Sequence, residues 1–156
     1  MASSVRRGIG STDEHALRVI RSYRHWTGRS LIGEVEPRRA AESLYLAPLY
    51  ILSHGMEADP VLNFGSKQAL DLWEMDWETF TRTPSRLTAE KVERDTREAF
   101  MRAVREQGFV SDYSGVRISA SGRRFVIEQA TVWNVLDETG VRCGQAAAFE
   151  RYRRLD

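Results

Sequence analysis

Cysteine is almost absent from this sequence, because Cys143 is the only one in 156 residues. A single thiol cannot form an internal disulfide, and such scarcity is typical of proteins in a reducing cytosol. A cytoplasmic location is therefore expected. A structural zinc site is disfavoured, because it takes about four clustered Cys or His ligands. The three histidines, His15, His25 and His54, are scattered along the chain.

Long apolar runs are missing as well. No stretch approaches the roughly 20 apolar residues that a membrane-spanning helix needs, and the first ten residues lack the apolar core of a secretory signal. Neither sign of charge dominates, since 23 Lys and Arg nearly cancel 22 Asp and Glu. A nearly neutral chain has no strong field toward nucleic acid or an anionic membrane. We therefore expect neither as a partner.

Short catalytic motifs are also lacking. The sequence holds no Walker-type phosphate loop, no dinucleotide-binding fingerprint and no nucleophile elbow. Glu128 lies within an apolar stretch, where it could be a pocket acid or could face solvent in an ion pair. An enzyme would need Glu128 beside His54 or Tyr113. Catalysis is therefore the least favoured of the functions considered.

The first half of the chain has helical patterning. Thr12 suits the N-cap of a first helix, and Pro37 suits the first turn of a second helix. We expect 1–11 to be a flexible leader and 12–48 to be an N-terminal helical extension. The extension and the main body, 49–156, should form one folded unit.

The main body follows the order strand, strand, helices, strand, strand, strand. The expected strands are 49–54, 61–64, 109–119, 124–136 and 141–152. Ser66 and Asp76 can cap short helices between them, and Thr88 opens the longest helix, which ends at Gly108. This segregation predicts an α+β fold. The prediction is a five-stranded antiparallel sheet with helices on one face and the N-terminal extension.

The strand expected at 124–136 has two faces by simple alternation. One face holds Phe125, Ile127, Gln129, Thr131, Trp133 and Val135, and the other holds Val126, Glu128, Ala130, Val132, Asn134 and Leu136. Both faces carry apolar residues, so we expect both to be at least partly covered. The N-terminal helices or a second subunit would cover the outer face, which leaves a homodimer open.

Several ordered stretches resemble the MEKHLA domain. They are 59–65, 69–73, 84–86, 112–119, 124–125, 130–134 and 144–147. The resemblance implies a PAS-like fold. The family occurs as stand-alone bacterial proteins, the type expected here, and at the C-terminus of plant class III homeodomain–leucine zipper proteins. The sequence shows no homeodomain or zipper, so the plant transcriptional role is not carried over, and the resemblance supplies no common ligand.

PAS-like folds often hold cofactors, and each cofactor makes demands on the sequence. A flavin adduct of the LOV (light-oxygen-voltage) type needs a cysteine in a motif that this chain lacks. Gln145 does lie in the last strand, where LOV domains place a flavin-contacting glutamine. A haem sensor needs an axial ligand such as histidine, and none falls in 88–107. Haem, a LOV-type flavin adduct and structural zinc are therefore not expected, and the cofactor stays unidentified.

A ligand cleft in a PAS-like fold lies between the sheet and the helices after the second strand. The candidate ligand-binding residues are Trp73, Trp77, Arg86, Tyr113, Arg117, Trp133 and Gln145. The two arginines could meet a carboxylate or phosphate, or could pair with Asp or Glu while the tryptophans fill the core. We expect a small-molecule binding or signal-sensing module that acts through an unidentified protein partner. The alternative is a ligand-free interaction or dimerisation module.

Overall fold

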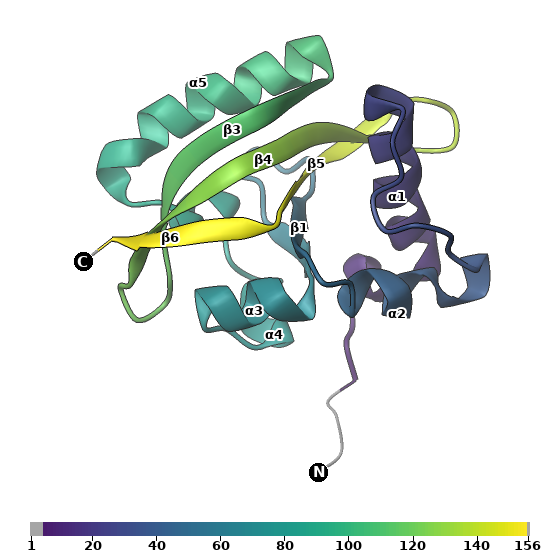
Figure 1. Cartoon of the computed structure of the whole chain (residues 1–156), viewed down its shortest axis with the longest axis horizontal. Coiled ribbons are helices and arrows are strands. Elements are labelled where there is room, and N and C mark those ends of the chain that lie inside the picture. The colour runs from purple at the N-terminus through teal and green to yellow at the C-terminus, as the bar shows by residue number, and fades with distance from the viewer. Residues whose placement is uncertain (1–4, 156) are drawn as a thin grey trace.

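An antiparallel sheet with helices packed on both faces makes up the fold (Figure 1). The computed structural model describes residues 5–155, apart from the side chains of residues 91–93, so the first four positions of the expected leader lie outside it. The strands are β1 (Tyr50–His54), β2 (Leu62–Gly65), β3 (Phe109–Ile118), β4 (Arg124–Leu136), β5 (Arg142–Phe149) and β6 (Arg151–Leu155). Their order is β2-β1-β5-β4-β3, and β6 also pairs with β4. The expected α+β arrangement is confirmed.

The helices begin where short polar side chains can cap them. They are α1 (Asp13–Thr27), α2 (Ala40–Tyr45), α3 (Lys67–Trp73), α4 (Trp77–Phe80) and α5 (Lys91–Gln107). Three 3-10 turns cover Ile9–Ser11, Pro37–Arg39 and Ser85–Thr88. The side chains of Thr12, Ser66 and Asp76 each accept a hydrogen bond from a backbone N–H of the helix that follows. The three predicted N-caps are therefore confirmed.

The prediction that Thr88 opens the longest helix is wrong. Thr88 ends a 3-10 turn, and its hydroxyl donates to the Ser85 carbonyl at 2.8 Å. That hydroxyl is therefore not turned toward the free amides of α5. Ala89 is extended, and the helix begins only after Glu90.

The expected last strand is also divided, at Glu150. The pairing along β4 keeps the same register on both sides of the break, since Thr131 pairs with Ala148 and Glu128 pairs with Arg151. β6 thus continues β5 along the same edge of β4, and the sheet has six strands rather than five.

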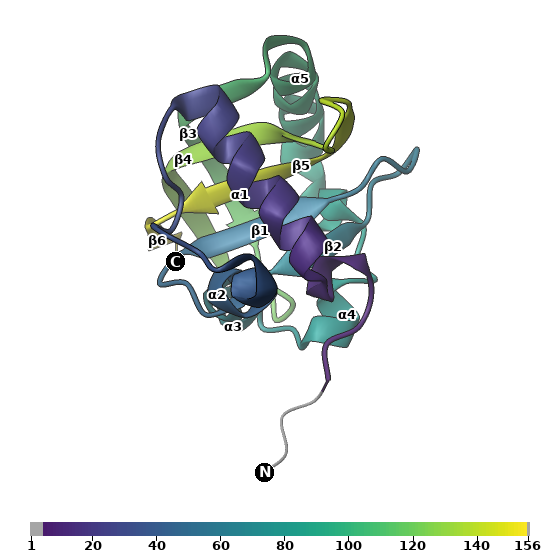
Figure 2. The same cartoon turned by 90° about the vertical axis from the view of Figure 1, so that its right-hand side faces the viewer.

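α1 covers the outer face of the sheet (Figure 2). Val19 of α1 is fully buried, and its backbone carbonyl accepts a hydrogen bond from Trp133 Nε1 at 3.3 Å. The Tyr23 ring meets the Trp133 ring edge-on, with centroids 4.9 Å apart. The apolar stripe of the first helix therefore packs on the sheet of its own chain.

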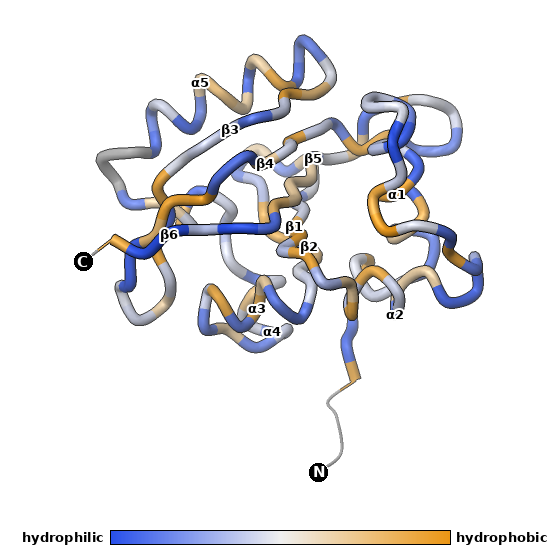
Figure 3. The backbone as a smooth tube through the Cα atoms, viewed as in Figure 1, coloured by the Kyte–Doolittle hydropathy of each residue, from blue (hydrophilic) through white to orange (hydrophobic). Residues whose placement is uncertain are grey.

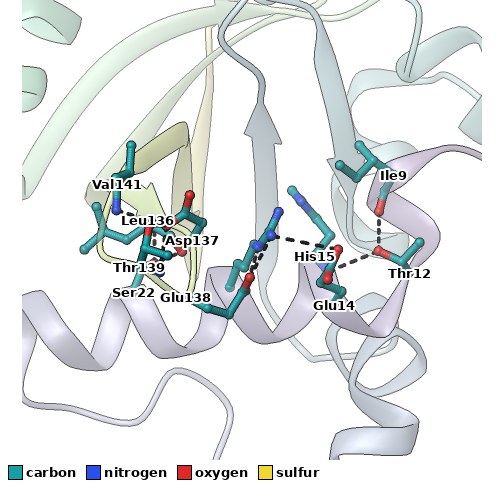
Figure 4. A network of polar contacts seen from close by, with 11 residues as sticks. Ile9, Thr12, Glu14, His15, Ser22, Leu136, Asp137, Glu138, Thr139 and Val141 are labelled. Atoms are coloured by element: carbon teal, nitrogen blue, oxygen red, sulfur yellow. Dashed lines mark hydrogen bonds and ion pairs between the residues drawn. The ribbon is translucent and has the colours of Figure 1, made fainter.

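Polar contacts fix α1 to the turn between β4 and β5 (Figure 4). Arg18 donates to both carboxylate oxygens of Glu138, at 2.7 and 2.8 Å. One turn further on, Ser22 Oγ accepts from the Leu136 backbone N–H at 2.7 Å. The Asp137 carboxylate accepts from backbone N–H groups within that turn and holds its shape. α1 is thus held to the sheet by polar contacts with the β4–β5 turn as well as by its apolar stripe.

A bulge in β4 reverses the orientation of its side chains. Gln129 has φ of 51°, and the pairing with β3 shifts by one residue between the pairs Tyr113–Ala130 and Gly115–Ile127. An extra residue in one strand moves every later side chain to the other face. Phe125 consequently packs on the inner side against Trp73. Trp133, expected on the same face, lies on the outer side under α1.

α5 is amphipathic and lies along β3 and β4 on the inner side of the sheet, with apolar and polar positions alternating along its path (Figure 3). Val104 is fully buried on its inner side, and Phe100 stacks on Tyr113 with ring centroids 3.8 Å apart. None of the helices between residues 5 and 155 combines the length and apolar character that crossing a membrane requires.

Candidate functional site

A small cavity of about 40 Å³ lies between α5 and the inner face of the sheet. Its apolar wall includes Leu52, Leu62, Met101, Ile127, Val132 and Ala147, and its polar lining includes His54, Ser85, Thr88, Arg97, Tyr113, Arg117 and Gln145. A water needs about 10–15 Å³ by this measure, whereas sites for drug-sized ligands run to about 300–1,000 Å³. In this conformation the cavity therefore has room for a few non-hydrogen atoms.

Four of the seven candidate ligand-binding residues meet at this cavity: Trp73, Tyr113, Arg117 and Gln145. They come from α3, β3 and β5. Trp73 and Gln145 are almost completely buried. The sequence could place these four together because each lies on an element whose type and order it indicated correctly.

The other three candidates lie elsewhere. Trp77 packs against Phe64, and its Nε1 donates to the backbone of the expected leader, at Arg7, over 2.9 Å. Arg86 is half exposed and forms an ion pair with Asp59 at 3.1 Å. Trp133 lies on the far side of the sheet, because the β4 bulge turns it toward α1.

Sequence reasoning did not select Arg97 or His54 as lining residues. Arg97 lies in a helix with many charged residues and looked like part of a solvated face, yet only 4% of it is exposed. His54 ends β1, and its Nδ1 lies 3.0 Å from the Gly55 carbonyl, so the expected turn contact is present. Burial lowers the pKa of His54, which therefore lines the cavity as a neutral ring.

Two buried arginines from different elements line the cavity. Arg97 comes from α5, and Arg117, of which 5% is exposed, comes from β3. Arg97 Nη2 donates to Ser85 Oγ, and Arg117 Nη2 donates to the Tyr113 hydroxyl at 3.2 Å. Burial, with the charge of Arg117 as a second cause, lowers the pKa of Arg97 to about 10. The lining therefore stays positively charged at neutral pH.

Unpaired polar atoms gather at the same place. Among the described side chains, three buried nitrogen or oxygen atoms lack a hydrogen-bond partner: Trp73 Nε1, Arg97 Nε and Gln145 Oε1. All three belong to residues that line this cavity. Buried polar groups are normally paired, and leaving one unpaired costs about 1–3 kcal/mol. Two donors and one acceptor without a partner, among the described side chains, thus belong to residues that line the cavity.

Glu128 is not among the residues that line the cavity. It lies beside β6, where its carboxylate is 3.5 Å from Arg153 Nε. His54 and Tyr113 line the cavity, so the carboxylate that a catalytic use would need is placed apart from them. Within the described part of the chain, no three His, Cys, Asp or Glu side chains gather so that they could hold a metal ion.

The MEKHLA-domain family model matches residues 13–154. Two curated relatives are homeobox-leucine zipper protein HOX29 of Oryza sativa subsp. indica and its counterpart of subsp. japonica. Each is 31% identical over 130 residues, which is 78% of this chain. The chain spans only 15% and 14% of the length of these relatives.

Solved structures with a similar fold are PAS and light-oxygen-voltage domains. A PAS domain of a protein from Colwellia psychrerythraea has a TM-score of 0.62 at 14% identity, covering 75% of this chain and 94% of that one. An RNA-binding light-oxygen-voltage receptor has a TM-score of 0.64 at 14% identity, covering 83% of this chain and 36% of that one. The fold is therefore PAS-like.

Because light-oxygen-voltage domains share this fold, a flavin is the natural cofactor to test against the cavity. The cavity, of about 40 Å³, is far smaller than the roughly 300–1,000 Å³ of sites that hold ligands of this size. Cys143 does not line the cavity and lies near Arg18 and the β4–β5 turn, where burial raises its pKa. The residues present do not fit a flavin that reacts with a cysteine, and the larger haem fits no better.

Proposed function

The chain belongs to the MEKHLA-domain family, and on that premise we propose that it is a PAS-like sensing module that binds a small molecule beneath α5 and acts through a partner chain. The observation that carries the proposal is that three buried atoms without a partner, Trp73 Nε1, Arg97 Nε and Gln145 Oε1, all belong to residues that line one cavity. A molecule with an acceptor for the two nitrogens and a donor for the oxygen would satisfy all three. Their unpaired state is otherwise a cost to the fold.

The size of the cavity constrains how a ligand enters. About 40 Å³ suits a very small molecule, and a larger one requires α5 to move outward. Among the described residues of α5, Val104 is the only fully buried apolar side chain. An element with few buried apolar contacts belongs to the less stable part of a fold. α5 is therefore the element that adjusts to the ligand.

Hydrogen bonds connect the cavity to α5 and α1. Gln145 Nε2 donates to the Met101 carbonyl at 3.1 Å and to Asn134 Oδ1 at 3.3 Å. Asn134 Nδ2 donates to the Val104 carbonyl at 3.1 Å, and the backbone carbonyl of Asn134 accepts from Trp26 Nε1 at 2.9 Å. A ligand that engages Gln145 would bias this network, and with it the position of both helices. A partner chain that contacts either helix would then sense the ligand.

Native mass spectrometry of freshly purified protein, followed by a thermal-shift screen of diverse small molecules, tests this function. We expect a bound molecule, or compounds that raise the midpoint of unfolding, because binding to the folded state alone stabilises it. The variant Ala147→Val fills the cavity and should abolish these effects while the chain still folds. A bare chain that no compound stabilises, or equal stabilisation of the Ala147→Val variant, would overturn the proposal.

A further inference from the structure

Two arginines from different elements line one small cavity. Arg97 on α5 and Arg117 on β3 are both at least nine-tenths buried, and both line the space that Leu62 and Ile127 also line. Bringing two like charges into a poorly hydrated space is unfavourable, because each raises the cost of the other. An element of opposite charge between them would remove that cost.

Among the side chains that the structure describes, carboxylates supply little of that negative charge. The carboxylate that contacts Arg97 belongs to Glu98, whose side chain is 52% exposed and meets Nη1 at 3.2 Å. Arg117 has neutral partners among the described residues, namely the Val116 carbonyl at 2.8 Å and the Tyr113 hydroxyl. The Nε of Arg97 has no acceptor among the described side chains. The lining of the cavity is therefore electropositive, and it includes a hydrogen-bond donor that has no partner among the described side chains.

We propose that the ligand of this cavity is a small organic acid whose carboxylate lies between Arg97 and Arg117. This inference rests on the proposed function and adds the chemical class of the ligand. The carboxylate accepts from Arg97 Nε and from the guanidinium of Arg117, which matches the planar geometry that arginine offers to carboxylates. The carbon part of the acid contacts the apolar wall formed by Leu62, Met101 and Ile127.

A matched series of acids and their primary amides tests the inference. The probes are acetate, isobutyrate and benzoate, each compared with acetamide, isobutyramide and benzamide, and inorganic phosphate is a further arm. Each amide has nearly the shape of its acid but no charge. We expect at least one acid to raise the midpoint of unfolding by several degrees at about 100-fold excess over its Kd. The matching amide should produce no comparable shift.

Variants then locate the charge that the acid needs. Arg97→Met and Arg117→Met keep most of the side-chain volume and remove the guanidinium. Each should weaken acid binding, measured by calorimetry, by about 10- to 100-fold, because a charged hydrogen bond is lost. Arg97→Lys should restore part of the affinity. Arg102→Met removes an exposed arginine from the same helix and should leave the affinity unchanged.

The outcomes separate this inference from the proposed function. Amides that bind as well as acids, or acid binding that survives both methionine variants, would overturn the anion assignment and leave a ligand-binding module. Stabilisation by phosphate alone would overturn the carboxylate assignment. If nothing in the series binds although the native protein carries another molecule, the acid is again wrong and the sensing function stands. If the methionine variants fail to fold, the acid-against-amide comparison on the unaltered chain still decides.

Discussion

His15 is a buried histidine that joins α1 to the sheet. Its Nε2 lies 3.0 Å from Ser53 Oγ, which in turn donates to Asn63 Oδ1 at 2.5 Å. Burial, followed by the nearby charge of Arg18, lowers the pKa of His15 from 6.5 to about 4. Between these two values the unfolded chain binds a proton that the folded chain does not. The fold therefore loses stability as the pH falls from 6.5 toward 4.

The first prediction follows from that difference in proton binding. The free energy of unfolding should fall between pH 6.5 and 4 by about 3 kcal/mol more in the natural chain than in His15→Gln. Urea denaturation at a series of pH values measures both curves, and the difference isolates His15 from the other buried histidine, His54. Parallel curves would show that His15 titrates normally in the folded chain.

Two buried tryptophans provide a second test at the residue scale. Trp133 donates its indole N–H to the Val19 carbonyl, whereas the N–H of Trp73 has no partner. Both side chains are almost completely buried, so replacement by Phe removes the same volume from the interior. In the ligand-free protein, Trp133→Phe should be less stable than Trp73→Phe by about 1 kcal/mol, the net value of one hydrogen bond. Equal stabilities would mean that the two indoles are equally satisfied.

At the scale of elements, the junction of α5 with β3 depends on Gly108. This residue has φ of 100°, and a Cβ atom there would overlap the Trp26 ring of α1. Gly122 also has positive φ, 91°, but a Cβ there would meet nothing within 4 Å. The two glycines therefore share the backbone strain that a substitution introduces, and differ in the steric contact.

Gly108→Ala should consequently cost about 1–3 kcal/mol more than Gly122→Ala, which is the usual penalty for overpacking. Chemical denaturation of both variants measures the difference. If the two variants are equally destabilised, the contact between the end of α5 and Trp26 does not constrain the fold.

The elements also show how far the sequence could lead. Caps at Thr12, Ser66 and Asp76 are local signals, and they placed three helices correctly. The reversal at Gln129 has no such signal, because a bulge in the middle of a strand depends on pairing with β3 and not on residue type. Trp133 was therefore assigned to the wrong side of the sheet for a physical reason. Trp73, on a correctly predicted helix, was placed well.

The burial of Arg97 could not be predicted from the sequence either. The residues around it on α5 are mostly charged, so helical periodicity describes a solvated face. Only the fold shows that this arginine lines the same cavity as Arg117, which comes from a strand whose register the sequence does not specify. Sites built from an unusual burial of charge need coordinates, whereas sites built from local motifs do not.

For the molecule as a whole, the N-terminal extension and the PAS-like body share one core. Ala16 and Val19 of α1 are fully buried against strands that include Trp133 and Val135. Removing 1–36 would expose these apolar strand residues to water, and large exposed apolar patches lead to association.

The truncated chain should therefore aggregate or lose its cooperative unfolding transition, whereas the full chain should unfold in one step. Size-exclusion chromatography and circular dichroism in the near and far ultraviolet measure this. A monomeric truncated chain with an unchanged transition would show that α1 is an independent attachment.

The indole N–H resonances of the four tryptophans test the central claim, that a small molecule binds in the cavity beneath α5, most directly. Trp26, Trp77 and Trp133 donate their indole N–H groups to carbonyls outside the cavity, whereas Trp73 lines the cavity and is the one of the four whose N–H has no partner. In nuclear magnetic resonance spectra of the ¹⁵N-labelled chain, the acid or other compound that most stabilises the protein should shift the Trp73 indole signal far more than the other three. A Trp73 signal that stays fixed while a different indole moves would place the ligand elsewhere and contradict the claim.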